Sequence, residues 1–290
     1  MSEPSNAPGS AIAVPSRQRL LIITPTLGVS RHLEETVRSI TSLRIPFLHL
    51  LCCPQPVVTK LQDRYPHAVV VADAGPEAGL YGALNIALRA ADKEDWQWFT
   101  YINDDDALAL DFSDVARDHL AQANPEPVVY GDVRMIDEEG GMVFLLTTEP
   151  SPRYLPALLR GGISALNQQG MLFRRDVVRE LVEFDIRYRI CADLDFWARA
   201  LAAGHRFRYY STEMGRFRVR RGQLSGDVRL TRREHDEIAR RLFPEAGGLL
   251  RRFLVKLRYR VRNLSRYLAR GRTVGWVSSN TILAGGGRPT

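Results

Sequence analysis

Cysteine is scarce in this 290-residue sequence: there are three, Cys52, Cys53 and Cys191, and two of them are adjacent. Such a set builds neither a CxxC pair nor a disulfide framework, so it excludes a structural zinc site and favours a reducing compartment. No stretch without a charged residue is longer than 273–287, which is short and rich in glycine, serine and asparagine. A membrane-spanning helix needs about 20 mostly apolar residues, so the sequence predicts none.

The first eighteen residues also lack the features of a secretory signal, because no apolar core follows a basic start. They are rich in proline, serine and alanine, a composition that does not support a packed core. We therefore expect residues 1–18 to be disordered and the protein to be cytoplasmic. A peripheral position at the inner face of the cytoplasmic membrane stays open.

Acidic residues are missing from the last part of the chain. Residues 247–275 hold nine arginine or lysine residues and no acid, which exceeds the net charge of +7 for the whole sequence. The basic residues are Arg251, Arg252, Lys256, Arg258, Arg260, Arg262, Arg266, Arg270 and Arg272. The positive charge therefore belongs to this segment, and the rest of the chain is close to neutral.

The same segment has a helical pattern of apolar residues. They are Leu249, Leu250, Phe253, Leu254, Leu257, Val261, Leu264 and Leu268, and they fall within an arc of roughly 140°. One interpretation is a helix that packs its apolar face on the rest of the protein and exposes its basic face. The other is an interfacial helix, spanning 249–272, that lies on an anionic membrane. Few aromatic residues are interleaved, so we expect no nucleic-acid partner.

Apolar runs and helical patterns alternate between residues 19 and 102. The runs, which are typical of strands buried on both faces of a parallel sheet, are residues 19–24, 47–53, 68–72 and 96–102. The helical patterns between them are residues 31–43, 57–65 and 79–91, the first with Ser30 as its expected cap. This alternation predicts an α/β protein with three layers and a mostly parallel sheet.

The second half of the sequence is less regular. We expect strands at residues 128–136, 142–147, 171–173 and 207–210, and a helix at residues 195–203 that Gly204 ends. Ligands of such sheets bind beyond the carboxyl ends of the strands. In the first half, that rule indicates residues 24–26, 73–81 and 103–106, which are polar or glycine-rich where the preceding strands are apolar.

An acidic run at the end of the fourth strand carries the most chemical information. Asp104, Asp105 and Asp106 repel one another unless a counter-charge is present, and a hard cation such as Mg²⁺ or Mn²⁺ removes that cost. The alternative is a solvated turn in which one aspartate caps a following helix.

A second acidic motif opens a predicted helix. Asp193 and Asp195 are two positions apart, so they face different directions and are not expected to do the same job. One can face a cleft as a base while the other caps the helix, and the alternative is that both only cap it.

The order of these motifs resembles family 2 glycosyltransferases of the GT-A fold, especially the branch that assembles bacterial polysaccharides. The matching series is TPT at 24–26, GLY at 79–81 with Asn85, the acidic run, YGDV at 130–133, NQQ at 167–169, FRR at 173–175, FD at 184–185 with Tyr188, ADLD at 192–195, AG at 203–204 and FRVRRGQLS at 217–225. The resemblance covers residues 19–226.

The resemblance implies a metal-dependent, inverting transfer of a sugar from a nucleotide-diphosphate sugar to an acceptor hydroxyl. Asp193 matches the family's catalytic base, and the acidic run matches its D-x-D element for Mg²⁺ or Mn²⁺, with Asp104/Asp106 and Asp105/Asp106 as alternative registers. The implied donor-binding residues are Thr24, Pro25, Thr26, Asp73, Gly79, Tyr81, Asn85, Asp104, Arg218 and Arg221. The implied acceptor is a glycan or a lipid-linked sugar, in the assembly of cell-surface polysaccharides.

Two features depart from the family pattern. After the second strand, where the family has an acid for the nucleotide base, this chain reads CCPQ at residues 52–55. Either Asp73 takes that role or the base is held differently. In the late loop, where many relatives have a histidine, this chain has Arg220, which leaves a third protein ligand to the metal open.

The resemblance also implies a division of the chain. Residues 19–245 would form the GT-A domain, with a nucleotide-sugar half at 19–106 and an acceptor half at 107–245, followed by the basic amphipathic tail at 246–290. Two other functions stay open: a GT-A-like nucleotidyltransferase, and a catalytically silent protein that binds nucleotide sugars or acts as a scaffold. Arg218, Arg220 and Arg221 can add positive charge near the pyrophosphate or form a solvated basic loop.

Overall fold

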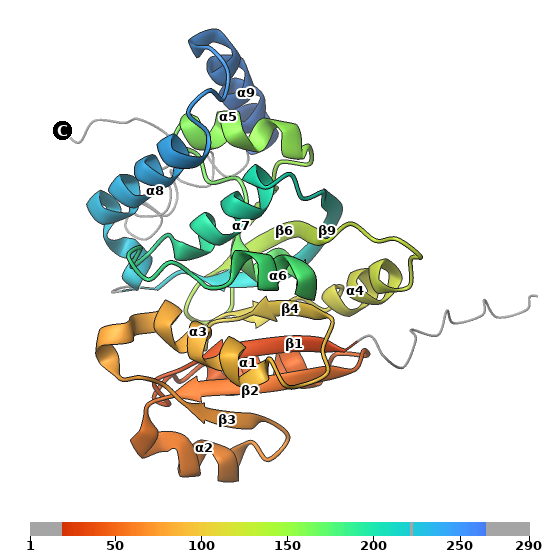
Figure 1. Ribbon diagram of the computed structural model, residues 1–290, viewed down its shortest axis with the longest axis vertical. Coiled ribbons are helices and arrows are strands. Elements are labelled where there is room, and N and C mark those ends of the chain that lie inside the picture. The colour runs from red at the N-terminus through yellow and green to blue at the C-terminus, as the bar shows by residue number, and fades with distance from the viewer. Residues whose placement is uncertain (1–18, 221–222, 265–290) are drawn as a thin grey trace, which may run out of the picture.

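The computed structural model describes residues 19–220 and 223–264 (Figure 1). The expectations for residues 1–18, for Arg221 and for the segment beyond residue 264 therefore lie outside the described residues. In the described part of the chain, no helix is long and apolar enough to cross a membrane.

One mixed sheet of nine strands runs through the part of the chain that the structure describes. Its strands are β1 (Leu20–Pro25), β2 (Phe47–Cys53), β3 (Val69–Ala72), β4 (Trp98–Tyr101), β5 (Ala107–Leu108), β6 (Val128–Ile136), β7 (Met142–Leu146), β8 (Met171–Arg174) and β9 (Phe207–Arg218). Their order is β3-β2-β1-β4-β8-β6-β9-β5, and β7 pairs with β6 outside this path.

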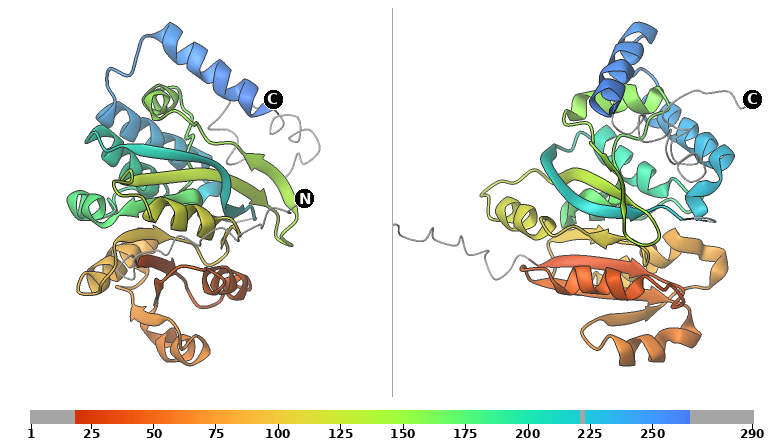
Figure 2. Two further views of the ribbon diagram at one scale, coloured as in Figure 1. Left: turned by 90° about the vertical axis from the view of Figure 1, so that its right-hand side faces the viewer. Right: turned by 180° about the vertical axis from the view of Figure 1, so that it is seen from behind.

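Helices cover both faces of the sheet, as Figures 1 and 2 show. The α-helices are α1 (Leu33–Thr41), α2 (Val58–Arg64), α3 (Gly79–Ala91), α4 (Phe112–Leu120), α5 (Leu155–Arg160), α6 (Arg175–Leu181), α7 (Ala192–Ala202), α8 (Val228–Leu242) and α9 (Leu249–Arg262). Short 3-10 turns lie at η1 (Gln55–Val57), η2 (Pro76–Ala78), η3 (Pro152–Tyr154), η4 (Gln168–Gly170) and η5 (Leu224–Gly226).

The first half of the sheet is parallel, because β3, β2, β1 and β4 all pair in the same direction. Side chains of β1 alternate between the two faces, so Leu21 and Ile23 pack with residues of α3, whereas Leu20 and Ile22 pack with Ile40 of α1 and with α4. The predicted α/β class with three layers is confirmed, and the four strands and three helices expected before residue 103 are all present.

The start of α1 differs from the expectation. The helix begins at Leu33 with His32 at the cap position. The Ser30 hydroxyl accepts the backbone N–H of His32 at 3.2 Å and donates to the backbone oxygen of Asp104 at 2.9 Å, a partner 74 residues away. A tertiary hydrogen bond is thus added to a local one of the kind that the sequence pattern predicts.

The second half of the sheet combines both directions. Strand β8 lies antiparallel between β4 and β6, and β6 is parallel to β9. Strand β9 extends to Arg218, eight residues beyond the expected end, and α7 begins at Ala192 rather than at Asp195. Gly215 of β9 passes directly over η4: a Cβ there would lie 2.2 Å from the backbone oxygen of Gln169, so only glycine fits.

Helix α9 packs on α5 with the face opposite to the one expected. Val255 and Tyr259 are its buried apolar side chains, whereas the predicted apolar stripe is exposed from Leu249 to Leu264. The interpretation in which this stripe packs on the rest of the protein is therefore wrong. The helix lies at the opposite end of the molecule from α2 and β3 (Figure 1).

Candidate active site

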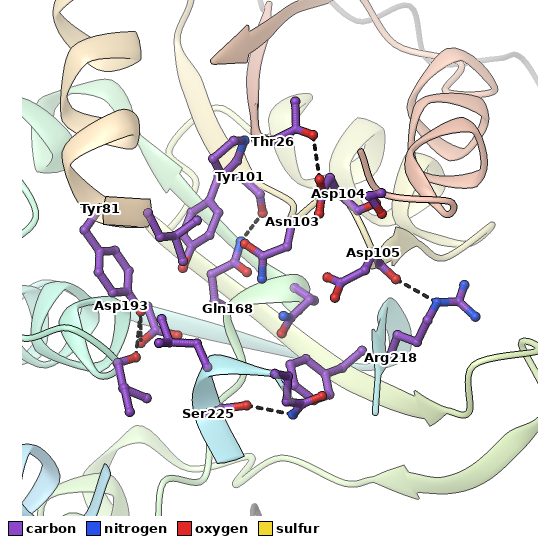
Figure 3. Close-up of a pocket in the computed structure, with 18 of the residues that line it drawn as sticks. Thr26, Tyr81, Tyr101, Asn103, Asp104, Asp105, Gln168, Asp193, Arg218 and Ser225 are labelled. Carbon is purple, nitrogen blue, oxygen red and sulfur yellow. Dashed lines mark hydrogen bonds between the residues drawn. The ribbon is translucent and has the colours of Figure 1, made fainter. Parts of the chain in front are cut away.

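A cavity of about 960 Å³ lies beyond the carboxyl ends of the parallel strands. All three segments that the sheet rule indicates contribute to its wall, through Pro25 and Thr26, through the stretch from Asp73 to Tyr81, and through Asn103 to Asp105. The second half of the chain closes it with residues of η4, α7 and β9. In Figure 3, Asp104 and Asp105 lie on one side, and Asp193 lies beside Tyr81 on the other.

Asp104 is held by the loop that follows β1. Its carboxylate accepts a hydrogen bond from the Thr26 hydroxyl at 2.5 Å, and the same hydroxyl accepts one from the backbone N–H of Gly28. Ser30 holds the backbone oxygen of Asp104. Burial raises the pKa of Asp104 above its usual value, although the bond from Thr26 opposes that shift. The first predicted loop therefore positions the first aspartate of the acidic run.

Asp105 faces a cation. Its carboxylate lies 2.5 Å from Nε of Arg220, and Arg220 also lines the cavity. The carboxylate of Asp105 and the guanidinium of Arg220 are both partly exposed to the cavity. The counter-charge that the acidic run requires is thus supplied here by Arg220.

Asp106 does not line the cavity, although both expected registers of the D-x-D element include it. Its side chain is buried and accepts hydrogen bonds from the backbone N–H of Arg218 and from the amides of Gln169 and Asn103. Burial raises the pKa of Asp106 to about 8. The two carboxylates at the cavity wall are those of Asp104 and Asp105, a pair that neither expected register names.

Arg218 is buried rather than directed freely at a ligand. Its guanidinium donates to the backbone oxygens of Asp105, Asp137 and Glu138, and to the carboxylate of Glu35 at 2.5 Å. Although it contributes to the cavity wall, its donors are used by the protein. Its observed contacts therefore position the acidic loop.

The donor set of the acidic loop fits a magnesium-type cation. Among residues 19–220 and 223–264, no three His, Cys, Asp or Glu side chains are grouped so that they could hold a metal ion. Mg²⁺ is, however, commonly bound by one or two carboxylates together with substrate phosphates, and Mn²⁺ accepts the same oxygen ligands. Asp104 and Asp105 supply two such carboxylates at the cavity wall.

Asp193 occupies the first turn of α7 and has no cation among its hydrogen-bond partners. Its carboxylate accepts hydrogen bonds from the Tyr81 hydroxyl at 3.2 Å and from the backbone N–H of Leu194 at 2.8 Å. Burial raises the pKa of Asp193 to about 6, while these two bonds oppose the shift. The result is a carboxylate that accepts a proton near neutral pH and faces the cavity.

A glutamate from α8 holds the start of α7. The carboxylate of Glu234 accepts the backbone N–H groups of Arg189, Ile190 and Cys191 at 2.8–2.9 Å. It therefore holds the turn that precedes α7, whereas the first-turn N–H of Leu194 is bound by Asp193, as the sequence expects of one of the two aspartates. Asp195 is buried in ion pairs with Arg199 and Arg241, so it neither faces the cavity nor caps the helix.

The expected donor-binding residues separate into two groups. Pro25, Thr26, Asp73, Gly79 and Tyr81 line the cavity, as do Asp104 and Arg218. Gly79 has φ +61, a backbone conformation that favours glycine at the turn into α3.

Thr24 and Asn85 lie outside the cavity wall. Thr24 is buried, with its hydroxyl 3.1 Å from the ring of His49, and the Asn85 amide bonds the backbone N–H and oxygen of Phe184. Their contacts are structural.

Several wall residues were not proposed from the sequence as site residues. Tyr101, Asn103 and Gln168 lie between the two acidic sites (Figure 3). The amide of Gln168 donates to the backbone oxygen of Tyr101, and so links η4 to the end of β4. The signal was present for Gln168, because the NQQ motif was part of the resemblance, but nothing in it gave a role.

No protein-family model matches this sequence, and no curated protein matches it significantly. Among solved structures, residues 1–349 of TarS from S. aureus, in complex with UDP-GlcNAc, match with a TM-score of 0.55 and 14% identity, over 79% of this chain and 72% of that chain. A longer TarS structure matches with a TM-score of 0.53 and 14% identity, over 78% of this chain but only 43% of its own length.

A mannosyltransferase from Pyrobaculum calidifontis, in complex with GDP-Man and Mn²⁺, matches with a TM-score of 0.55 and 17% identity, over 92% of this chain and 78% of that chain. The chain has the GT-A glycosyltransferase fold. At these identities the likeness extends to the fold and not to a substrate.

Proposed function

We propose that this protein is an inverting glycosyltransferase that moves a sugar from a nucleotide-diphosphate sugar to an acceptor hydroxyl. The observation that carries the proposal is the pairing of two acidic sites across one cavity in a GT-A fold. Asp104 and Asp105 line one part of the wall, and Asp193, with a raised pKa, lines another. Two solved structures of the same fold hold UDP-GlcNAc and GDP-Man, which supports a nucleotide-sugar donor here.

Asp193 acts as the general base in this proposal. An inverting transfer needs a group that takes the proton from the acceptor hydroxyl as that oxygen attacks the anomeric carbon. A carboxylate with a pKa of about 6 is mostly ionised at neutral pH and is a better proton acceptor than an ordinary aspartate. Tyr81 and the N–H of Leu194 orient it toward the cavity.

The acidic loop holds the donor end. Bound Mg²⁺ or Mn²⁺ would neutralise the charge that develops on the departing nucleotide diphosphate. We propose Asp104 and Asp105 as its protein ligands, because both line the cavity and Asp106 does not. Thr26 and Arg218 hold these residues in place.

The halves of the chain then have separate tasks. We propose that residues 19–106 bind the nucleotide sugar and that residues 107–245 bind the acceptor, within one domain at 19–245. Asp73 lines the cavity beside the end of β2, where the family acid is missing, and we assign it to the nucleotide base. The acceptor is a glycan or a lipid-linked sugar of cell-surface polysaccharide assembly, and the basic tail at 246–290 brings the enzyme to the inner face of the cytoplasmic membrane.

Thermal shift with nucleoside diphosphates, each with and without Mn²⁺ or Mg²⁺, tests the donor side. A ligand that binds only the folded state raises the melting temperature. We expect at least one nucleotide to stabilise the protein in a metal-dependent way, and this stabilisation to be lost in Asp105→Asn. The absence of any metal-dependent nucleotide effect would contradict the proposal.

Product release tests the reaction itself. A panel of nucleotide sugars is assayed for metal-dependent release of nucleoside diphosphate, which glycosyl transfer or slow donor hydrolysis produces. Release of inorganic pyrophosphate from nucleoside triphosphates would indicate a nucleotidyltransferase instead. Nucleotide-sugar binding without any turnover would indicate the silent binding protein.

A further inference from the structure

Helix α9 exposes a continuous apolar stripe. Seven large apolar side chains, Leu249, Leu250, Phe253, Leu254, Leu257, Val261 and Leu264, recur at intervals of three and four residues, and their exposed fractions run from 47% at Leu257 to 82% at Leu249. Side chains with this spacing lie on one face of a helix. An exposed apolar face of this size marks an interaction surface rather than ordinary surface variation.

The opposite face of α9 is fixed to the rest of the protein by specific contacts. The guanidinium of Arg258 pairs with the fully buried carboxylate of Glu149. The buried amide of Asn263 bonds the backbone N–H and oxygen of Thr147 at 3.0 and 2.9 Å. Rolling the helix to bury its apolar stripe would break both connections and leave Glu149 without its cation. The stripe therefore faces outward because the fold holds it there.

The charge around the stripe has one sign. Residues 247–264 contain six basic residues and no acid. At 100° per residue, the stripe spans the arc from Leu249 to Leu254. Arg260 lies inside this arc next to Leu249, Lys256 lies just beyond the same edge, and Arg251 lies beyond the other edge. An apolar face bordered by arginine and lysine is the pattern of a helix that lies at the interface of an anionic lipid bilayer.

We propose that α9 is an interfacial helix that docks this protein on an anionic lipid surface, with the apolar stripe inserted among the acyl chains and the flanking basic residues at the lipid phosphates. A second copy of the chain is a poorer occupant, because two stripes placed face to face would also bring two sets of basic residues together. Nucleic acid would satisfy the charge but would leave the stripe exposed.

This surface is separate from the cavity, so the inference stands whether or not the chain transfers a sugar. None of the residues of α9 lines the cavity. A vesicle-binding result and a nucleotide-binding result can therefore succeed or fail independently.

The test is co-sedimentation of the full chain with vesicles of phosphatidylcholine alone and of phosphatidylcholine with phosphatidylglycerol. The test variant is the triple substitution Leu250→Ser, Phe253→Ser and Leu257→Ser, whose three native side chains are exposed. Leu110→Ser is the control, since Leu110 is a leucine on another part of the molecule that is more exposed than any of the three. Substitution is preferable to removal of α9, because removal would strip Glu149 of its partner.

We expect the unmodified protein and Leu110→Ser to bind the anionic vesicles, and the triple variant to bind them at least about tenfold less tightly. Raising the salt from about 0.1 M to 0.5 M should weaken binding, because it screens the basic residues. Circular dichroism and the melting temperature of the triple variant should match those of the control.

Three outcomes would overturn the inference. Equal binding by the triple variant would show that the stripe does not contact the lipid. Equal binding to the neutral vesicles would show that the basic residues do not contribute to binding. A vesicle-independent dimer that the triple variant abolishes would assign the stripe to a second copy.

Discussion

The two acidic sites of the cavity use the same side chain in opposite surroundings. Around Asp104 and Asp105, a hydroxyl, Arg220 and the buried guanidinium of Arg218 surround the loop. Around Asp193 there is no cation among the hydrogen-bond partners, and burial raises its pKa to about 6. The acidic loop thus has cations beside its carboxylates, whereas the carboxylate of the α7 site has none among its hydrogen-bond partners.

This difference explains how one cavity can keep its two tasks apart. A carboxylate paired with a cation is a poorer base than one without, and Asp193 is the one without. The separation depends on residues outside the cavity wall as much as on the aspartates themselves. The following substitutions are ordered from the largest expected effect to the smallest.

Replacing the lone carboxylate should have the largest effect. Asp193→Asn removes the proton acceptor but keeps the size of the side chain, so we expect turnover to fall about 10²–10⁴-fold. Metal-dependent nucleotide binding should be unchanged, because the acidic loop is intact. Asp118→Asn, at an exposed aspartate of α4, is the control. Unchanged turnover in Asp193→Asn would remove its role as base.

Weakening the support of the acidic loop should act on stability first. Arg218→Gln leaves the Glu35 carboxylate and three backbone oxygens without their buried donor. We expect the free energy of unfolding to fall by about 2–4 kcal/mol, measured by urea denaturation. Metal-dependent nucleotide stabilisation should also weaken. A variant with normal stability would show that the arginine is dispensable for the loop.

A change in the pKa of Asp193 tests its role as the proton acceptor. Because the base must be ionised, kcat/KM should rise with pH through an apparent pKa of about 6 and then level off. The Tyr81 hydroxyl stabilises the charged form and so lowers the pKa of Asp193. Tyr81→Phe should therefore move the rising limb to higher pH. A uniform loss of activity without any shift would indicate a purely structural role for Tyr81.

Arg220 should give the smallest effect. Its guanidinium pairs with Asp105 and competes with a metal ion for the same carboxylate. In Arg220→Gln we expect Mn²⁺ to bind a few-fold more tightly, measured by calorimetry in the absence of nucleotide. The effect is small because an exposed ion pair contributes about 1 kcal/mol or less. Weaker nucleotide binding in the same variant would indicate that Arg220 also contacts the diphosphate. Weaker Mn²⁺ binding would contradict the competition.

The first half of the fold was predictable because its strands are buried on both faces. Continuous apolar runs such as LLIIT and FLHLLCC are typical of strands buried on both faces of a parallel sheet, and each forms a parallel strand. Strand β9 was predicted only for its first four residues. Its later residues include exposed, partly exposed and buried positions, with the polar residues Thr212, Glu213 and Arg216 among them, so no apolar run extends to its end.

Helices α4, α5, α6 and α8 were not predicted at all. Two of them, α5 and α6, have six and seven residues, too few to establish a helical period. Helix α8 is long, but its sequence VRLTRREHDEIARRL has only a few apolar residues and buries Glu234 and His235 as well as Ile238. Its position is set by the tertiary contacts of those polar groups, which no local pattern reports.

The candidate site was predictable as a set of segments but not as a set of side chains. The sheet rule located the acidic run correctly, yet which aspartate turns inward depends on Gln169 and Arg218, which lie 63 and 112 residues further along the chain. The same applies to Asn85, whose amide is taken by Phe184. The spacing of residues within a motif does not predict contacts between residues so far apart in the sequence.

The hydrogen bonds between Glu234 and the three backbone N–H groups before Ala192 limit how far the protein can be shortened. A fragment that ended at the last strand would retain every sheet residue and all three aspartates of the acidic loop. It would nevertheless release the turn that carries Asp193, because the carboxylate closing that turn comes from α8. Any engineered minimal version of this protein must therefore include Glu234 and the part of α8 that holds it.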